Sequence, residues 1–115
     1  MTVKLHAITF DCVDPQALAQ FWSRVLGQDV DPSDSPGIAT IGMGQSSPFY
    51  VFQKLDGLPA GRNRAHPDFA TSDYEAECTR LLGVGASVVA EVKENGIRFT
   101  TFTDPEGNTF DLADE

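Results

Sequence analysis

The chain contains only two histidines. Imidazole can bind a metal ion or transfer a proton near neutral pH, so these two residues are the first candidates for chemistry. His6 stands in "KLHAITF" and His66 in "RAHPDF", and each heads a run of residues typical of a strand. The two positions are sixty residues apart. Two scarce imidazoles in similar settings leave three interpretations open: coincidence, packing, or two ligands of one site.

Composition excludes several classes of partner. Eight basic and 17 acidic residues give a formal net charge of −9, which argues against nucleic acid, because a phosphate backbone needs a basic surface. No apolar run approaches the roughly 20 residues that cross a bilayer, so no membrane contact is expected. The N-terminus lacks the basic-then-apolar pattern of a signal peptide. Cys12 and Cys78 fit neither a disulfide framework nor a zinc knuckle, so we expect reduced thiols in the cytoplasm.

The first half of the chain predicts a strand, a helix and further strands. The strand over 3–10 is followed by a helix within "VDPQALAQFWSRVLGQ". Asp14 can cap the free amides of its first turn, Pro15 suits its first position, and Gly27 supplies the left-handed residue that ends it. Its apolar residues fall three and four apart and form one stripe for the core. Strands are then predicted over 38–44 and 48–55.

The second half predicts the same order of elements. A strand in "AHPDFA" precedes a helix in "TSDYEAECTRLLGVGA", whose start has the Ser72…Glu75 spacing of a capping box. Strands follow in "ASVVAEV", "GIRFTTFT" and "NTFDLA", and "DPEG" has the residues of a type I turn. Alternation in the last strand puts Asp111 on the face opposite to Phe110 and Leu112.

Two similar halves indicate a duplication. We predict a single α+β domain, residues 1–115, built of two βαβββ modules over about 1–56 and 64–115. Each module leaves a hydrophobic sheet face to be buried. We therefore expect the modules to form a curved mixed sheet around one cleft, with the helices on the outside.

This arrangement resembles the vicinal oxygen chelate superfamily, which includes glyoxalase I, bleomycin-resistance proteins and extradiol dioxygenases. The resemblance covers nearly the whole chain. It is carried by "LHAITFDCVDPQALAQFWSRVLG", by "NRAHPDFATSDYEAECTRLLGVGASVV" and by "TFTDPEGNTFDL", and it is closest to small bacterial glyoxalase-like proteins. It implies the fold strongly and the reaction weakly, because members include lyases, epimerases, dioxygenases, thiol transferases and proteins that only bind drugs. It also implies a homodimer.

The resemblance implies a set of metal ligands. In metal-dependent members four inward side chains hold a divalent ion, and three of these positions fall on His6, His66 and Asp111. The fourth, a glutamate, falls near Gln53 or Val51, where this sequence has no carboxylate. The remaining set suits Zn²⁺, Ni²⁺, Fe²⁺ or Mn²⁺. The residues expected to line the cleft and bind the ligand are Phe10, Phe49, Gln53, Asp68 and Phe102.

Two functions follow from these expectations. The first is a glyoxalase/bleomycin-resistance-like protein that binds a small organic molecule without changing it, which the missing fourth ligand favours. The second is a metal-dependent lyase, isomerase or dioxygenase with a degenerate His/His/Asp site. Gln53 cannot accept a proton, which weakens the second. A partner-binding module with a filled cleft is a third interpretation.

Overall fold

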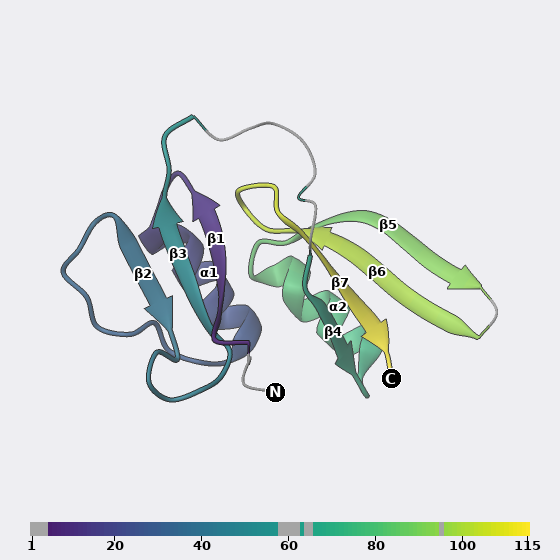
Figure 1. Cartoon of the computed structure of the whole chain (residues 1–115). Coiled ribbons are helices and arrows are strands. Elements are labelled where there is room, and N and C mark those ends of the chain that lie inside the picture. The colour runs from purple at the N-terminus through teal and green to yellow at the C-terminus, as the bar shows by residue number, and fades with distance from the viewer. Residues whose placement is uncertain (1–4, 58–62, 64–65, 95) are drawn as a thin grey trace. The chain divides into compact units, whose positions relative to one another are not determined.

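The computed structural model describes residues 5–57, 63, 66–94 and 96–115. The chain forms two compact units, Met1–Pro59 and Ala60–Glu115, each with one helix and one sheet (Figure 1). The sheets have three and four strands, and both mix parallel and antiparallel pairs. The predicted α+β class is therefore confirmed. No described helix is long and apolar enough to cross a membrane.

The first unit contains β1 (Ala7–Cys12), α1 (Pro15–Leu26), β2 (Ile38–Ile41) and β3 (Phe49–Lys54). Its sheet has the order β1-β3-β2, with β1 parallel and β2 antiparallel to β3. Asp14 caps α1 by accepting a 3.2 Å hydrogen bond from the Ala17 amide, and Gly27 ends it at φ 67°. Both helix boundaries confirm the sequence prediction.

The described part of the first unit has two strands after α1, where the βαβββ pattern predicted three. Val30 stands in place of the missing strand and forms only an isolated bridge to Ile41. The segment that follows contains Pro32 and Pro36. Two prolines disfavour a regular strand in this segment, and its described pairing goes no further than Asp31, whose amide donates to the Thr40 carbonyl at 2.8 Å.

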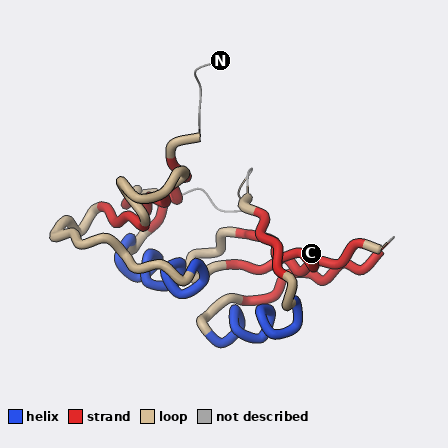
Figure 2. Tube along the Cα trace, turned by 90° about the horizontal axis from the view of Figure 1, so that it is seen from below, coloured by secondary structure: helices blue, strands red, loops and turns tan. Residues whose placement is uncertain are grey.

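The core of the first unit lies between α1 and the sheet. Phe10 of β1 stacks on Trp22 of α1, with ring centroids 5.1 Å apart, and on Phe52 of β3 at 5.6 Å. Trp22 and Phe52 are completely buried. Figure 2 shows that each helix lies along one side of the strands of its own unit. In the first unit, the Phe10 side is therefore the helix-covered side.

The second unit contains β4 (Asp68–Thr71), α2 (Tyr74–Gly83), β5 (Ser87–Glu94), β6 (Ile97–Thr103) and β7 (Thr109–Asp114). Its sheet order is β4-β7-β6-β5, with β4 parallel to β7 and the other pairs antiparallel. The stacked rings of Phe102 and Phe110, both fully buried, form the centre of its core. This unit has the predicted βαβββ order.

The start of α2 differs from the predicted capping box. The cap residue is Asp73, one position after Ser72, and its side chain accepts no cap hydrogen bond. The Asp73 amide instead donates to the Thr71 hydroxyl at 3.0 Å. Because Thr71 ends β4 and bonds this amide, the turn into the helix is set by the strand, and the Ser72…Glu75 spacing is not used.

The "DPEG" turn before β7 has the predicted form. The Gly107 amide donates to the Asp104 carbonyl at 2.9 Å, and Gly107 has φ 87°. The Asp104 carboxylate, 4% exposed, accepts hydrogen bonds of 2.9 Å from the amides of Glu106 and Asn108 and from the Asn108 side chain. The turn is therefore held by its own aspartate and fixes where β7 begins.

Candidate metal centre

A cluster of one imidazole and two carboxylates lies on the second unit. His66 Nε2 is 3.2 Å from Asp68 Oδ1 and 3.2 Å from Asp111 Oδ2. One ligand-type atom from each of the three residues falls within 4.8 Å of the others. The exposed fraction of the side chain is 29% for His66, 71% for Asp68 and 16% for Asp111. The cluster is therefore most open to solvent at Asp68 and least open at Asp111.

The register of the parallel strands brings these side chains together. Asp68 of β4 is the direct partner of Asp111 of β7. His66 precedes Asp68 by two residues, the spacing that puts side chains on the same face of an extended chain. The Asp111 amide donates to the Pro67 carbonyl at 3.1 Å, which continues the ladder to the position beside His66.

The cluster occupies the sheet face that α2 does not cover. Phe110 and Leu112, on either side of Asp111 in β7, are buried on the other face, where the rings of Phe102 and Phe69 meet Phe110. Alternation along β7 therefore turns Asp111 away from the helix. This confirms the predicted orientation of the last strand.

Neighbouring side chains hold the cluster in place. Thr101 of β6, 6% exposed, donates its hydroxyl to Asp111 Oδ1 at 2.5 Å, so each carboxylate oxygen of Asp111 has a partner. Asn63 accepts hydrogen bonds from the amide and hydroxyl of Thr109 at 2.8 and 2.7 Å. These bonds hold Asn63, three residues before His66 in the sequence, against the start of β7.

The donor set fits a divalent cation. Imidazole nitrogen and carboxylate oxygen suit Zn²⁺, Mn²⁺ and Fe²⁺. Neighbouring ligand atoms at about 2.1 Å from one ion lie about 3.0–3.5 Å apart, and both His66–carboxylate distances are 3.2 Å. Facing carboxylates on paired strands repel one another unless a positive charge lies between them. A cation is therefore compatible with the cluster both chemically and electrostatically.

The predicted metal ligands belong to both units. His66 and Asp111 lie together, and Asp68, expected only as a polar group of the cleft, joins them. His6 belongs to the first unit, where its exposed ring meets Phe49 edge-on at 4.9 Å. The two-residue spacing between His66 and Asp68 already indicated that both side chains lie on one face of the strand. The pairing of Asp68 with Asp111 depends on the register of β4 and β7, which the sequence does not show.

The structure corrects the face assigned to two of the predicted lining residues. Phe10 packs against Trp22, and Phe102 is fully buried against Phe110, so both belong to helix-covered cores. Phe49 and Gln53 lie on the other face of β3, because Phe52 points to the helix. Phe49 is 9% exposed, whereas Gln53 is exposed.

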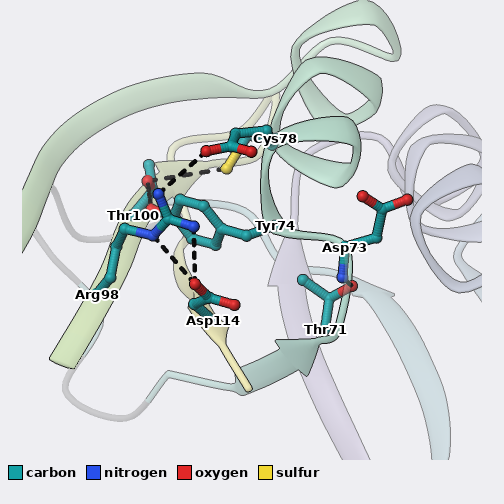
Figure 3. Close-up of polar contacts among 8 residues, drawn as sticks. Thr71, Asp73, Tyr74, Cys78, Arg98, Thr100 and Asp114 are labelled. Carbon is teal, nitrogen blue, oxygen red and sulfur yellow. Dashed lines mark hydrogen bonds and ion pairs between the residues drawn. The ribbon is translucent and has the colours of Figure 1, made fainter. Parts of the chain in front are cut away.

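A second polar network lies on the helix-covered face of the second unit (Figure 3). Arg98 bonds Asp114 at 2.7 Å and Glu75 at 3.1 Å, and its guanidinium lies 4.2 Å from the centre of the Tyr74 ring. The hydrogen bond to Asp114 raises the pKa of Arg98 above its usual value. Burial raises the pKa of Tyr74, whose hydroxyl bonds Thr100. These contacts join α2 to β6 and β7, so we assign them to stability.

Comparison with known proteins identifies a family. A model of the glyoxalase-like domain matches residues 7–113. Among curated proteins, none matches this sequence.

Solved structures share the fold. A glyoxalase/bleomycin resistance protein/dioxygenase family enzyme from Burkholderia phytofirmans PsJN has a TM-score of 0.80 at 16% identity, over 97% of this chain and 98% of that one. A superfamily member from Sphaerobacter thermophilus DSM 20745 has a TM-score of 0.73 at 24% identity, over 100% and 99%. A mutant of the fosfomycin resistance protein FosX from Listeria monocytogenes, complexed with Mn(II) and 1S,2S-dihydroxypropylphosphonic acid, has a TM-score of 0.77 at 15% identity, over 98% and 90%.

Proposed function

Since the chain belongs to the glyoxalase-like domain family, we propose that it binds a small, oxygen-rich organic molecule beside a divalent metal ion held by His66, Asp68 and Asp111. The observation that carries this proposal is the pair of carboxylates that face one another across β4 and β7 with an imidazole 3.2 Å from each. A bound ion would supply a Lewis acid that attracts ligand oxygens. The FosX mutant structure, which contains Mn(II) and a dihydroxy phosphonic acid, supports this choice of metal and ligand class.

The protein's own side chains prepare this site. Thr101 fixes one oxygen of Asp111 and leaves the other directed at His66. Asp68 is the most exposed of the three side chains. Its carboxylate is therefore the part of the cluster that an entering ligand meets first.

A metal-dependent lyase, isomerase or dioxygenase is the second candidate. The exposure of Asp68 favours it, because a solvent-accessible carboxylate can take a proton from a bound molecule when it is not itself bonded to the ion. The two functions can be separated with an Asp68 variant and a candidate substrate. An enzyme would lose turnover in this variant while it still binds the substrate.

We also propose that the protein is a cytoplasmic homodimer. Cys12 and Cys78, which form no disulfide in the described structure, suit a reducing compartment, and the strongly acidic composition suits solubility. The resemblance of the chain to dimeric superfamily members supports self-association.

Metal binding provides the test. Protein purified without chelators is analysed for metal content, stripped, and titrated with Mn²⁺ by calorimetry. We expect one ion per chain, and we expect His66→Ala and Asp111→Asn each to weaken binding by at least about 100-fold, since each removes a ligand. Asp73→Asn is the matched control, because it removes an exposed carboxylate from the same unit outside the cluster.

His6→Ala tests whether the first histidine belongs to the same ligand set. Unchanged Mn²⁺ affinity in this variant would remove His6 from the set and leave the cluster as proposed. The proposal is refuted if the stripped wild-type protein binds no ion, or if Asp111→Asn binds as tightly as the wild type while far-UV circular dichroism shows an intact fold.

A further inference from the structure

The outer strand of the second unit is exposed along its length. β5 pairs with β6 on one side and forms one edge of the four-stranded sheet (Figure 1). All of its residues are exposed except Val92, which is half-buried. Since β7 pairs with β6 only over Phe99–Thr103, the far ends of β5 and β6 reach past the rest of the sheet. An edge strand of this kind can accept another strand through its free backbone groups.

This strand also carries an unusual amount of exposed apolar surface. Val88 is 45% exposed, Val89 is 56% exposed, and Ile97 at the start of β6 is 60% exposed. The charged residues Glu91 and Lys93 lie between these apolar positions. A partner for this edge must therefore offer both apolar contact and matching charges.

The register of the hairpin determines which backbone groups face the open edge. Glu94 pairs with Ile97, and two residues separate them in the sequence. Strand partners separated by two residues in the sequence form a hydrogen-bonded pair, and bonded and non-bonded pairs then alternate along an antiparallel ladder. Glu94 and Val92 therefore direct their N–H and C=O groups to β6. Glu91 and Lys93 direct theirs outward.

We propose that β5 pairs antiparallel with β5 of a second copy of this chain, about a twofold axis at Val92. In this register Glu91 of each copy faces Lys93 of the other, so both outward-facing residues exchange backbone hydrogen bonds and opposite charges meet twice. Val92 faces Val92 of the second copy. This interface deepens the proposed homodimer and is independent of the metal cluster.

Charge selects this register over its neighbours. An axis at Glu91 would place two carboxylates opposite one another, and an axis at Lys93 would place two ammonium groups together; both arrangements are destabilising. The β-bulge between Val88 and Ala90 limits regular pairing to the segment from Ala90 to Glu94. Pairing about Val92 uses that whole segment in both copies.

Charge reversal tests the register. Sedimentation velocity of the full chain over a dilution series gives the dimer dissociation constant for the wild type, Glu91→Lys, Lys93→Glu and the double variant. Each single change places like charges opposite one another twice, so we expect the dissociation constant to rise by about tenfold or more. The double variant restores both opposite-charge pairs and is expected to return to within about threefold of the wild type.

A disulfide at the axis gives an independent measurement. In a Cys78→Ser background, Val92→Cys is expected to form a covalent dimer on mild oxidation, because facing residues of a non-hydrogen-bonded pair are about 4.5 Å apart at Cα. Ala90→Cys is the control, since its two copies would lie about 13 Å apart along the strands.

The outcomes separate this interface from the other proposals. A wild-type protein that is monomeric at all concentrations overturns both the homodimer and the interface. A dimer that is insensitive to the charge reversals and is not cross-linked at residue 92 overturns this interface and leaves the homodimer standing. Neither result bears on Mn²⁺ binding.

Discussion

Replacement of Asp68 by asparagine should change the stability of the protein in opposite directions with and without metal. The ligand-type oxygens of Asp68 and Asp111 lie within 4.8 Å of one another. At that distance two unit charges repel by about 0.9 kcal/mol in a water-like dielectric and about 3.5 kcal/mol at an effective dielectric of 20. Because the Asp68 side chain is 71% exposed, screening makes the lower value appropriate.

In EDTA at pH 8, Asp68→Asn is therefore expected to raise the free energy of unfolding by about 1 kcal/mol, because it removes one of the two facing negative charges. With Mn²⁺ at 100 times the dissociation constant, the wild type gains about 2.7 kcal/mol from binding. A variant that binds tenfold more weakly gains about 1.4 kcal/mol under the same conditions. The advantage of the variant in EDTA should thus disappear or reverse when metal is added.

Urea denaturation followed by far-UV circular dichroism measures both effects, with and without Mn²⁺. Asp73→Asn serves as the control, because it lowers the net negative charge equally but lies outside the cluster. If Asp68→Asn instead destabilises the protein in EDTA and Mn²⁺ has no effect on either form, the carboxylate serves as a structural acceptor for His66. The metal argument would then fail.

Two further substitutions test the supports of the site. Asp104→Ala removes three hydrogen bonds of 2.9 Å from a 4% exposed aspartate, and we expect a loss of about 2–4 kcal/mol in urea denaturation. An Asp104→Ala variant as stable as the wild type would show that the turn does not depend on its aspartate. Thr101→Val keeps the shape of the side chain but removes the hydroxyl that holds Asp111, and should weaken Mn²⁺ binding by about 10–100-fold. Unchanged affinity would mean that Asp111 is positioned without Thr101.

The sequence predicted those features that depend on neighbouring residues. Asp14 and Pro15 start α1, and Gly27 ends it, because capping and left-handed termination are decided within one turn. The "DPEG" turn and the alternation that turns Asp111 away from Phe110 are local in the same sense. Capping, turn chemistry and strand alternation were therefore sufficient to predict the fold class and the orientation of Asp111.

Features that depend on distant contacts were predicted less well. Alternation divides the residues of β1 into two sets, but it does not say which set a helix will cover. Phe10 was assigned to the open face, whereas packing on Trp22 places it in the core. Phe102 was misplaced for the same reason, since its partner Phe110 belongs to the buried set. In both cases apolar burial decides the face, and this requires knowledge of where the helix lies.

Asp68 shows how far register can change the meaning of a residue. Its spacing from His66 was visible in the sequence, but its role follows from the direct pairing with Asp111. A shift of one residue between β4 and β7 would place Phe69 opposite Asp111 and turn Asp68 toward the α2 side. Such a shift would also expose Phe69, whose ring meets Phe110 in the core. The contact between Phe69 and Phe110 therefore fixes the register that brings two carboxylates to one imidazole. Apolar packing on one face of the sheet offsets the repulsion between Asp68 and Asp111 on the other face.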